Sequence, residues 1–409
     1  MVELVIASLG AQGDGQAIVD GGTVYVPFTL PGERVEARVE GDRGQLVQVL
    51  GPGPDRVSPA CRHFGECGGC ALQHMGTAAY LEWKRGQVVR AFAARGLSPE
   101  VAPAMPAAPG TRRRAVLTGR RQDSGVALGY HRRHGSELAD VAECPVLRPA
   151  IVAVLPALRN LLGLLLSGKG EARVTVLETA TGLDILIAGV PEPRDHRTRA
   201  AVAAQASGAG IARLTVGGEL LSQLHAPRLY FGETAAVPPP GAFVQAVAEA
   251  EAALVARVLA ACKGARQVAD LFCGAGTFTL PLARGAQVTA VEMDKDLLDA
   301  LEAASASGKG LRRIRTERRD LFREPLSLRE LSRFDAVVFD PPRAGAKAQA
   351  QMLARSRVPV VVAVSCNPAT LARDARILVD GGYRLGPVEP VDQFLWSPHV
   401  EAVAVFTKG

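Results

Sequence analysis

Apolar residues follow three different patterns along the 409 residues of the chain. In the first part, short β-type runs alternate with turn residues, as in a small barrel of five strands. In the second part, helical and strand-like runs are mixed. In the third part, strand-like and helical runs alternate regularly, as expected for a parallel sheet covered by helices. The sequence therefore predicts three domains, over residues 1–55, 56–237 and 238–409.

Proline and glycine clusters mark the domain edges, at residues 51–59 and at Pro238-Pro239-Pro240. The β-type runs of the barrel cover residues 4–6, 15–19, 22–26, 33–39 and 45–50. In the second domain, strands are expected over residues 115–117, 173–177, 183–188 and 213–216, and a helix over 150–166. The first helix of the third domain, expected over residues 244–261, carries Gln245 near its start.

Two apolar runs of the third domain end in residues that can take part in catalysis. The β-branched run 358–364 leads into Ser365-Cys366-Asn367-Pro368, and the run 334–339 leads into Asp340-Pro341-Pro342-Arg343. Parallel strands end at one edge of an open sheet, where ligands bind, so Cys366 and Asp340 are expected to face the same crevice. A lone cysteine after a strand is more often an inert buried residue than a nucleophile, so the interpretation of Cys366 depends on its neighbours.

A glycine-containing loop upstream indicates which ligand the crevice holds. The segment Asp270-Leu271-Phe272-Cys273-Gly274-Ala275-Gly276 follows an apolar strand, and its glycines let the backbone approach a ligand closely. About twenty residues later, Glu292 ends a second strand, where its carboxylate can accept both ribose hydroxyls of a nucleoside. Dehydrogenases and flavoproteins share this pattern. Thr279 stands in place of the third glycine of the dinucleotide fingerprint, which favours S-adenosylmethionine over NAD or FAD.

Taken in order, these motifs resemble those of the RNA uridine-5-methyltransferase family. The family pattern comprises a Phe-x-Gln motif, the glycine loop, an acidic strand end, Asp-Pro-Pro-Arg, Ser-Cys-Asn-Pro and a C-terminal His-Val-Glu. The corresponding segments here are Phe243-Val244-Gln245, 270–276, Glu292, 340–343, 365–368 and His399-Val400-Glu401. Val247, Thr277 and the pair Leu395-Trp396 replace residues that are usual in the family, which affects the expected cofactor contacts rather than the reaction.

Methylation of uridine at C5 requires a thiol and a base. C5 of uracil is a poor nucleophile, but a thiolate added to C6 produces an enolate whose C5 can attack an electrophilic methyl group. Cys366 is the expected nucleophile. The C5 proton must then leave before the thiolate can be eliminated, and Glu401 is the expected base.

The resemblance also implies a set of cofactor contacts. Gln245 is expected to hydrogen-bond the methionine end of S-adenosylmethionine, and Asp340 to line the wall between the methyl group and the base. The expected cofactor-binding residues are Gln245, Phe272, Gly274, Gly276, Thr277, Glu292, Asp320 and Asp340.

Four of the seven cysteines form a second group, which consists of Cys61, Cys67, Cys70 and Cys144. The odd cysteine count and the lack of a recognisable secretion signal argue against disulfides. Four thiolates suit a [4Fe-4S] cluster, and the cluster-bearing branch of the resembled family has the same spacing. Zinc is the alternative, because Cys67 and Cys70 form a Cys-x-x-Cys pair. The spacing differs from that of radical enzymes, so the cluster is expected to be structural or to contact RNA.

The formal net charge of +6 indicates a polyanionic partner. Between positions 111 and 134 there are seven arginines and one acidic residue. The candidate RNA-binding residues in this stripe are Arg112, Arg113, Arg114, Arg132 and Arg133. A second arginine run, at residues 312–319, is equally consistent with the solvated end of a helix. No apolar run is long enough to span a membrane, and we expect a cytoplasmic monomer.

Pro31-Gly32-Glu33 resembles the turn of the TRAM domain, an oligonucleotide-binding (OB) barrel found in many RNA-modifying enzymes. The expected fold is thus an N-terminal OB-type β-barrel, a central α+β iron–sulfur domain and a C-terminal Rossmann-like class I methyltransferase domain. The expected function is S-adenosylmethionine-dependent methylation of uridine C5 in RNA, with 23S ribosomal RNA as substrate. Three alternatives stay open: a transfer-RNA uridine-5-methyltransferase, a cytosine-5 methyltransferase and a non-catalytic RNA-binding iron–sulfur sensor.

Overall fold

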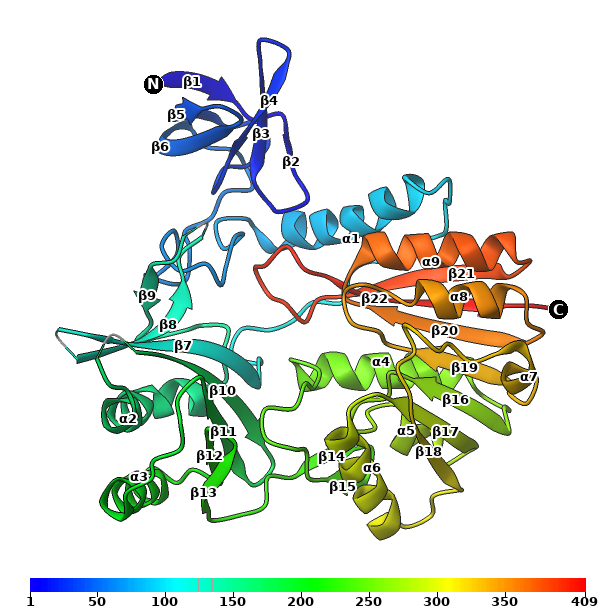
Figure 1. The fold of residues 1–409 in the computed structure, drawn as a ribbon. Coiled ribbons are helices and arrows are strands. Elements are labelled where there is room, and N and C mark those ends of the chain that lie inside the picture. The colour runs from blue at the N-terminus through cyan, green and yellow to red at the C-terminus, as the bar shows by residue number, and fades with distance from the viewer. Residues whose placement is uncertain (124, 134, 169) are drawn as a thin grey trace.

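The computed structural model describes residues 1–123, 125–133, 135–168 and 170–409. Within these ranges the chain forms sheets of six, seven and seven strands and a two-stranded hairpin. The three large sheets follow one another along the chain and are spatially separate (Figure 1). No helix in the described ranges is long and apolar enough to cross a membrane.

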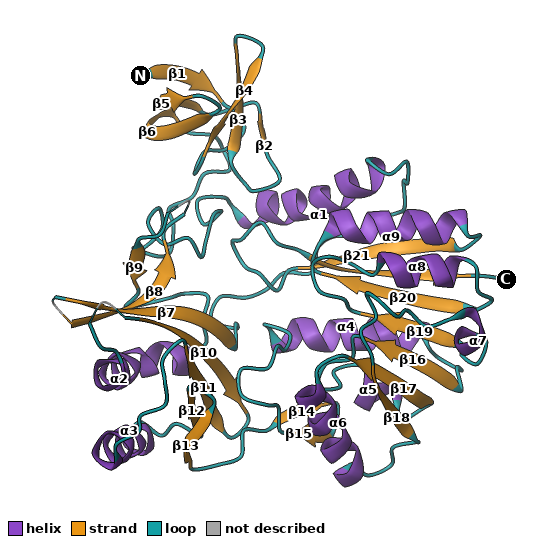
Figure 2. Cartoon of the chain, in the orientation of Figure 1, coloured by secondary structure: helices purple, strands orange, loops and turns teal. Residues whose placement is uncertain are grey.

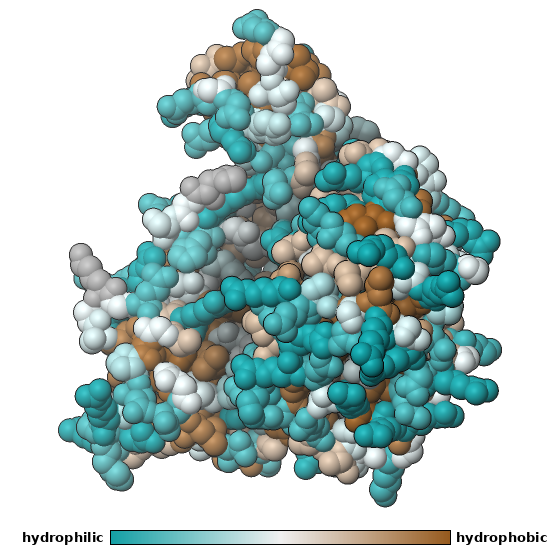
Figure 3. Space-filling model, turned by 45° about the vertical axis from the view of Figure 1, so that its right-hand side comes forward, coloured by the Kyte–Doolittle hydropathy of each residue, from teal (hydrophilic) through white to brown (hydrophobic). Residues whose placement is uncertain are grey.

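The first sheet forms an N-terminal unit of six strands. They are β1 (Val2–Val5), β2 (Ser8–Leu9), β3 (Gly15–Val19), β4 (Gly22–Val26), β5 (Arg34–Glu40) and β6 (Arg43–Gly51), in the order β1-β5-β6-β4-β3-β2. Each predicted run overlaps one strand, and β2 is an additional short strand. Alternate residues such as Val24, Val26, Val35 and Ala37 form its core. On the face shown in Figure 3, the surface recedes between this unit and the rest of the molecule.

The second sheet is antiparallel except where β11 pairs with β12. Its strands are β7 (Arg114–Gln122), β8 (Gly125–His131), β9 (Leu138–Asp140), β10 (Glu171–Thr179), β11 (Gly182–Ala188), β12 (Arg213–Val216) and β13 (Glu219–Gln223). Every second strand residue, as in Val174 and Val176, packs with helices α2 (Pro149–Leu165) and α3 (His196–Gly208) in one core. The hairpin of β14 (Leu229–Phe231) and β15 (Thr234–Ala236) then leads to the last unit.

The third sheet has the order β18-β17-β16-β19-β20-β22-β21, and its strands β16 to β20 are parallel. The strands are β16 (Gln267–Leu271), β17 (Gln287–Glu292), β18 (Ile314–Arg318), β19 (Ala336–Phe339), β20 (Val360–Ser365), β21 (Arg384–Val391) and β22 (Glu401–Thr407). The helices of this unit are α4 (Ala248–Ala261), α5 (Thr279–Leu282), α6 (Lys295–Ser307), α7 (Leu328–Leu331), α8 (Lys347–Ala354) and α9 (Pro368–Asp380).

Helices cover both faces of this sheet (Figure 2). The strands are apolar at successive positions, so each one contributes to two cores. Val337 and Phe339 of β19 pack with α8 and α9, whereas Val338 packs on the other face with Leu254 and Val258 of α4. This is the predicted α/β architecture of the third domain.

Two local predictions are corrected by the structure. The helix expected from residue 244 begins only at Ala248, because Val247 is extended and the backbone of Ala246 is bonded to other segments. The N–H of Ala246 donates to Gln393 Oε1 (2.9 Å), and its carbonyl accepts from Arg113 N–H (2.9 Å). The second arginine run forms the edge strand β18 rather than the end of a helix, because Ile314 and its neighbours pair with β17.

Helix α1 (Thr77–Ala93) lies against the third sheet, although its sequence position is in the predicted central domain (Figure 1). Val88 and Phe92 are fully buried in the same core as residues of α9. The segment that follows α1 runs beside β21, with bridges between Val101 and Val388 and between Met105 and Val391. The sheet that carries the C-terminal motifs is therefore partly covered by residues 77–105.

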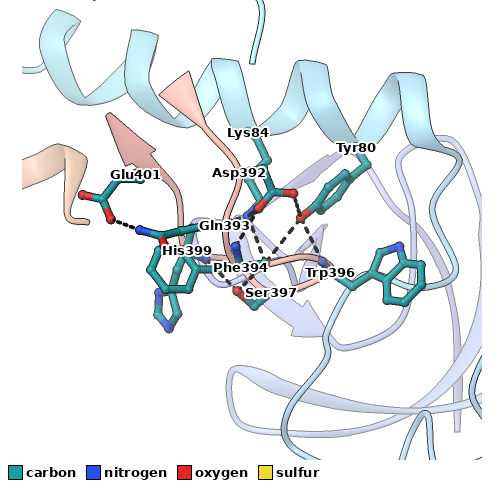
Figure 4. Close-up of polar contacts among 9 residues, drawn as sticks. All are labelled: Tyr80, Lys84, Asp392, Gln393, Phe394, Trp396, Ser397, His399 and Glu401. Atoms are coloured by element: carbon teal, nitrogen blue, oxygen red, sulfur yellow. Dashed lines mark hydrogen bonds and ion pairs between the residues drawn. The ribbon is translucent and has the colours of Figure 1, made fainter. Parts of the chain in front are cut away.

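A buried ion pair fixes α1 to the segment between β21 and β22 (Figure 4). Lys84 Nζ donates to Asp392 Oδ1 (3.0 Å), and both side chains are fully buried. Tyr80 Oη donates to Asp392 Oδ2 (2.6 Å). Lys84 also donates to the backbone carbonyls of Phe394 and His399, so each of its protons has an acceptor.

We expect Lys84→Met to lower the free energy of unfolding by about 3–5 kcal/mol, because it leaves Asp392 as an uncompensated buried charge. The double variant Lys84→Met/Asp392→Asn removes both charges and keeps an acceptor for Tyr80, so it should recover part of the loss. Trp83 and Trp396 are the two tryptophans of the chain and flank the pair in sequence, so urea unfolding followed by tryptophan fluorescence measures the effect. A single variant within about 1 kcal/mol of wild type would contradict this account.

Candidate active site

Three candidate catalytic residues meet at one edge of the third sheet. Asp340 directly follows β19, Cys366 directly follows β20, and Glu401 is the first residue of the antiparallel strand β22. Phe339 pairs with Ala363, and Ser365 pairs with Ala402, so these strand ends are adjacent. The register therefore brings together the thiol and the two carboxyl groups, as predicted from the strand ends for Cys366 and Asp340.

Cys366 is half-buried and lines a cavity of about 160 Å³ together with Arg343 and His399. Ala11 and Gln12, from the loop between β2 and β3, line the same cavity. Burial and the negative charges of Glu401 and Asp340 together raise the pKa of Cys366 to about 11, against the opposing effect of Arg343. The thiol is therefore protonated at neutral pH and must lose its proton when it attacks.

Of the two carboxyl groups, that of Glu401 is buried and that of Asp340 is partly buried. Glu401 is 2% exposed, and burial together with the charge of Asp340 raises its pKa well above the usual value. Burial also raises the pKa of Asp340 to about 7, against the effect of a hydrogen bond from Gln245. Since two buried like charges repel each other, the pair holds a proton more readily than two exposed carboxyl groups would.

Two glutamine side chains connect these carboxyl groups. Gln245 Nε2 donates to Asp340 Oδ2 (2.9 Å), and Gln393 Nε2 donates both to Gln245 Oε1 (2.6 Å) and to Glu401 Oε2 (2.7 Å). Gln245 was predicted as a cofactor contact near the start of a helix, but it lies in the extended segment before α4. The sequence analysis missed Gln393, because no motif or periodicity singles out one polar residue in an irregular segment.

His399 lies beside the thiol and is neutral. Burial and the positive charges of Arg343, Lys84 and Arg112 together lower the pKa of His399 to about 4. Arg343 Nη2 therefore donates to the unprotonated Nδ1 of His399 (2.9 Å). Asn367 Nδ2 donates to the carbonyl of Arg343 (3.1 Å), which connects this arginine to the loop that carries Cys366.

The glycine loop follows β16 and is shaped by left-handed backbone conformations. Phe272 has φ +59°, Gly274 φ +55° and Gly276 φ +102°. A Cβ atom on Gly276 would lie 2.6 Å from Leu301 Cδ1, so only glycine fits there. Thr277 follows directly, and the loop ends where Thr279 Oγ1 donates to the buried Asp270 Oδ2 (2.5 Å).

Glu292 ends β17 beside this loop. Its Oε2 accepts a hydrogen bond from Gly274 N–H (3.1 Å), and its Oε1 accepts one from Met293 N–H (2.7 Å). Next to them the rings of Phe272 and Phe322 lie 5.4 Å apart, and Asp320 Oδ1 accepts from Phe322 N–H (3.0 Å). The predicted cofactor residues therefore gather around the ends of the neighbouring strands β18, β17, β16 and β19.

Residues 238–408 match the family model "tRNA (Uracil-5-)-methyltransferase". The chain is 49% identical to an RNA methyltransferase of Brucella suis over all of this chain and 98% of that one. It is 34% identical to the 23S rRNA (uracil(1939)-C(5))-methyltransferase RlmD of Chromohalobacter salexigens, over 97% of this chain and 87% of that one. The chain belongs to the RNA uracil-5-methyltransferase family.

A solved structure supports the same fold. The Pyrococcus abyssi tRNA (uracil-54, C5)-methyltransferase in complex with S-adenosyl-L-homocysteine aligns with a TM-score of 0.77, 24% identity and 99% coverage of both chains. The predicted family, the RNA methyltransferase activity and the methyltransferase fold are thus confirmed. The barrel type, the iron–sulfur cluster and the individual site residues stay predictions.

The four cysteines of the second group line one cavity of about 480 Å³ in this methyltransferase. Gly68 N–H donates to the carbonyl of His131 (3.0 Å), which fixes the loop that carries Cys67 and Cys70 to the end of β8. A Cβ atom on Gly68 would lie 2.5 Å from that carbonyl oxygen, so the turn needs glycine. Among the residues that the structure describes, no three His, Cys, Asp or Glu side chains are arranged to hold a metal ion.

The prediction that Arg113 binds RNA is corrected by its surroundings. It is 7% exposed, and its Nη2 donates to Glu251 Oε2 (2.6 Å) while its Nε donates to the carbonyl of Gln245 (3.1 Å). Arg113 therefore joins the central sheet to α4 and does not face a nucleic acid. Arg113 directly precedes β7, where the central sheet meets the segment before α4, so its burial depends on a contact between two units that the run of arginines does not show.

The other stripe arginines differ in their surroundings. Arg112 lines the cysteine cavity, and Arg114 Nε donates to the carbonyl of Ala242 (3.1 Å). Burial and the charges of Arg112 and Arg173 lower the pKa of Arg114 to about 10. Arg132 is exposed at the end of β8. The adjacent Arg133 forms an ion pair with Asp14 (2.7 Å), which connects the central and N-terminal units.

Proposed function

We propose that this enzyme methylates C5 of a specific uridine in 23S ribosomal RNA, with S-adenosylmethionine as the methyl donor. The observation that carries the proposal is the half-buried thiol of Cys366 beside the partly buried carboxyl group of Asp340 and the buried carboxyl group of Glu401 at one sheet edge. The ribosomal substrate is supported by the relative from Chromohalobacter salexigens, which is named for a 23S rRNA uracil and matches 97% of this chain. A transfer-RNA substrate is the second candidate, because the family model carries that name.

Residues of this chain can carry out the steps on the uracil ring in which protons are transferred and the C6–S bond is made and broken. The Cys366 thiol gives its proton to solvent and Sγ forms a bond to C6 of uracil, so the C5=C6 double bond breaks and its electron pair is shared between C5 and O4. C5 then takes up the methyl group. Glu401 removes the C5 proton, the C6–S bond breaks, and its electron pair returns to Sγ. The raised pKa of Glu401 makes it a stronger base once it is ionised, so elimination should become faster as the pH rises through that pKa.

The residues around the glycine loop fit S-adenosylmethionine, which supplies an electrophilic methyl group when bound. Glu292 would hold the ribose, because a carboxylate has about four acceptor sites and only some are used by the loop. The 47% exposed side chain of Phe322, with Phe272 behind it, would stack on the adenine, next to Asp320. Gly274, Gly276 and Thr277 would let the loop backbone approach the methionine part.

We infer that Cys61, Cys67, Cys70 and Cys144 would hold a [4Fe-4S] cluster, because all four line one cavity although their side chains are not drawn together as around a single metal ion. All four donors are thiols, and they come from two segments that are also joined by an ion pair between Arg62 and Glu143 (3.6 Å) and by a hydrogen bond from Ala142 N–H to His63 Nε2 (3.4 Å). Such a cluster would crosslink the loop 61–70 to the segment around Cys144. The role of the cluster in this proposal is structural, since Cys366 and Glu401, which act on the uracil ring, are not among its ligands.

The N-terminal unit and the central sheet would bind the RNA. We interpret the first sheet as an OB-type, TRAM-like barrel. Its loop between β2 and β3 places Ala11 and Gln12 in the wall of the Cys366 cavity, so RNA bound to the barrel would lie close to the thiol. Arg112, Arg114 and Arg132 are the proposed phosphate contacts. A uridine in folded RNA must leave its stack to reach Cys366, which costs a few kcal/mol that these contacts would offset.

Glu401→Gln should allow addition and methyl transfer but stop elimination. A methylated covalent complex between protein and RNA should therefore accumulate, and turnover should fall by roughly 10²–10⁴-fold. Denaturing gels and mass spectrometry of the complex measure both effects. Cys366→Ala should give no complex, and Glu219→Gln, on the exposed strand β13, should behave like wild type. Turnover of Glu401→Gln near the wild-type rate would refute its role as the base.

Protein prepared without oxygen should contain about four irons and four sulfides per chain. Cys70→Ser should lose most of the iron and absorb less in the visible range, since one ligand is missing. Cys262→Ser serves as the control, because Cys262 is buried in the core under α4, away from the cavity. One zinc per chain without inorganic sulfide would overturn the cluster and leave the methyltransferase proposal intact.

A further inference from the structure

Gln393 contacts Glu401 directly and Asp340 through Gln245, and its amide has a single possible orientation. It is 1% exposed, and all of its polar atoms are paired. Its Oε1 accepts from Ala246 N–H (2.9 Å), while its Nε2 donates to Glu401 Oε2 (2.7 Å) and to Gln245 Oε1 (2.6 Å). If the amide were rotated by half a turn, its NH₂ group would face the N–H of Ala246 and its oxygen would face a carboxyl group. The surroundings therefore fix which atom faces Glu401.

The backbone on both sides of Gln393 is also fixed (Figure 4). The preceding residue, Asp392, accepts from Lys84 (3.0 Å) and Tyr80 (2.6 Å). The carbonyl of the following residue, Phe394, accepts from Lys84 (3.3 Å) and from Ser397 Oγ (2.8 Å). The position of the amide is thus determined by α1 and by its own loop, independently of Glu401.

The remaining oxygen of Glu401 is free. Within the described part of the chain, Oε1 is buried and has no hydrogen-bond partner. The other charged or titratable groups around it are Asp340, whose charge raises the pKa of Glu401, and Cys366, whose pKa Glu401 raises in turn. Gln393 is the neighbour that lowers the pKa of Glu401. Without it, Glu401 would be free to turn toward Asp340 and share a proton with that carboxyl group.

We propose that Gln393 is a positioning residue for the elimination step: its amide holds Glu401 through Oε2 and leaves Oε1 free to take the C5 proton. A donated hydrogen bond favours the ionised carboxylate, so Gln393 also keeps the base usable at lower pH. Through Gln245, the same amide keeps Asp340 at a fixed separation from Glu401. This inference rests on the proposed role of Glu401 as the base.

The test is the rate at which the methylated covalent complex releases product RNA, measured by rapid quench from pH 6 to 10. Gln393→Met has a side chain of similar length without hydrogen bonds. We expect its rate profile to move to higher pH by about one to two units, because a hydrogen bond to a charged group is lost. Formation of the covalent complex with RNA that contains 5-fluorouridine does not need the base, so it should stay within about twofold of wild type.

A matched control separates positioning from loss of structure. Gln349 on α8 is also 1% exposed, and its Oε1 accepts from Leu326 N–H (2.8 Å), away from the sheet edge. Gln349→Met loses a comparable buried hydrogen bond, and its pH profile should not move. Gln393→Glu is the second variant, for use if Gln393→Met does not fold. It keeps the side-chain shape and adds a like charge beside Glu401, so it should also move the rate profile to higher pH.

The results distinguish the two proposals. Unshifted profiles in both Gln393 variants would overturn the positioning role, even if their turnover is reduced. A shift of the same size in Gln349→Met would also overturn it, because the effect would then come from loosened packing. If wild-type protein forms no covalent complex with 5-fluorouridine RNA, the proposed function itself fails.

Discussion

The buried ion pair between Lys84 and Asp392 is the interaction on which the rest of the site depends. Removing two charges from water is costly, and the cost is offset only when geometry and further hydrogen bonds are good. Here Tyr80 and two backbone carbonyls complete the pairing. The pair fixes the segment between β21 and β22, which ends at Glu401. A helix from early in the chain thereby determines where the C-terminal base lies.

The same segment also forms part of the wall of the cysteine cavity. Ala71 and Leu72, directly after Cys70, donate their N–H groups to the carbonyl of Trp396 (2.8 and 3.0 Å). His399 and Pro398 line both this cavity and the one at Cys366. The proposed cluster and the proposed nucleophile therefore lie on opposite sides of a single short loop. A shift of this loop at the cysteine cavity would also move the residues that line the Cys366 cavity.

Much of the site could be predicted from the sequence, because strand ends are visible as apolar runs that stop at polar motifs. Cys366, Asp340 and Glu292 lie at the predicted edge for this reason, and the four distant cysteines share one cavity. Gln393 and Lys84 could not be predicted, because their burial depends on contacts between α1 and a segment about three hundred residues away. Arg113 was misread, since the composition of the stripe does not show which of its arginines is buried in an ion pair.

The most direct test of the central claim is mass-spectrometric mapping of 5-methyluridine in total RNA from cells that lack this protein. The account predicts that 5-methyluridine disappears from a defined position in 23S ribosomal RNA, returns with the wild-type gene and does not return with Cys366→Ala. Unchanged 5-methyluridine together with loss of a different modification, such as 5-methylcytidine, would contradict it.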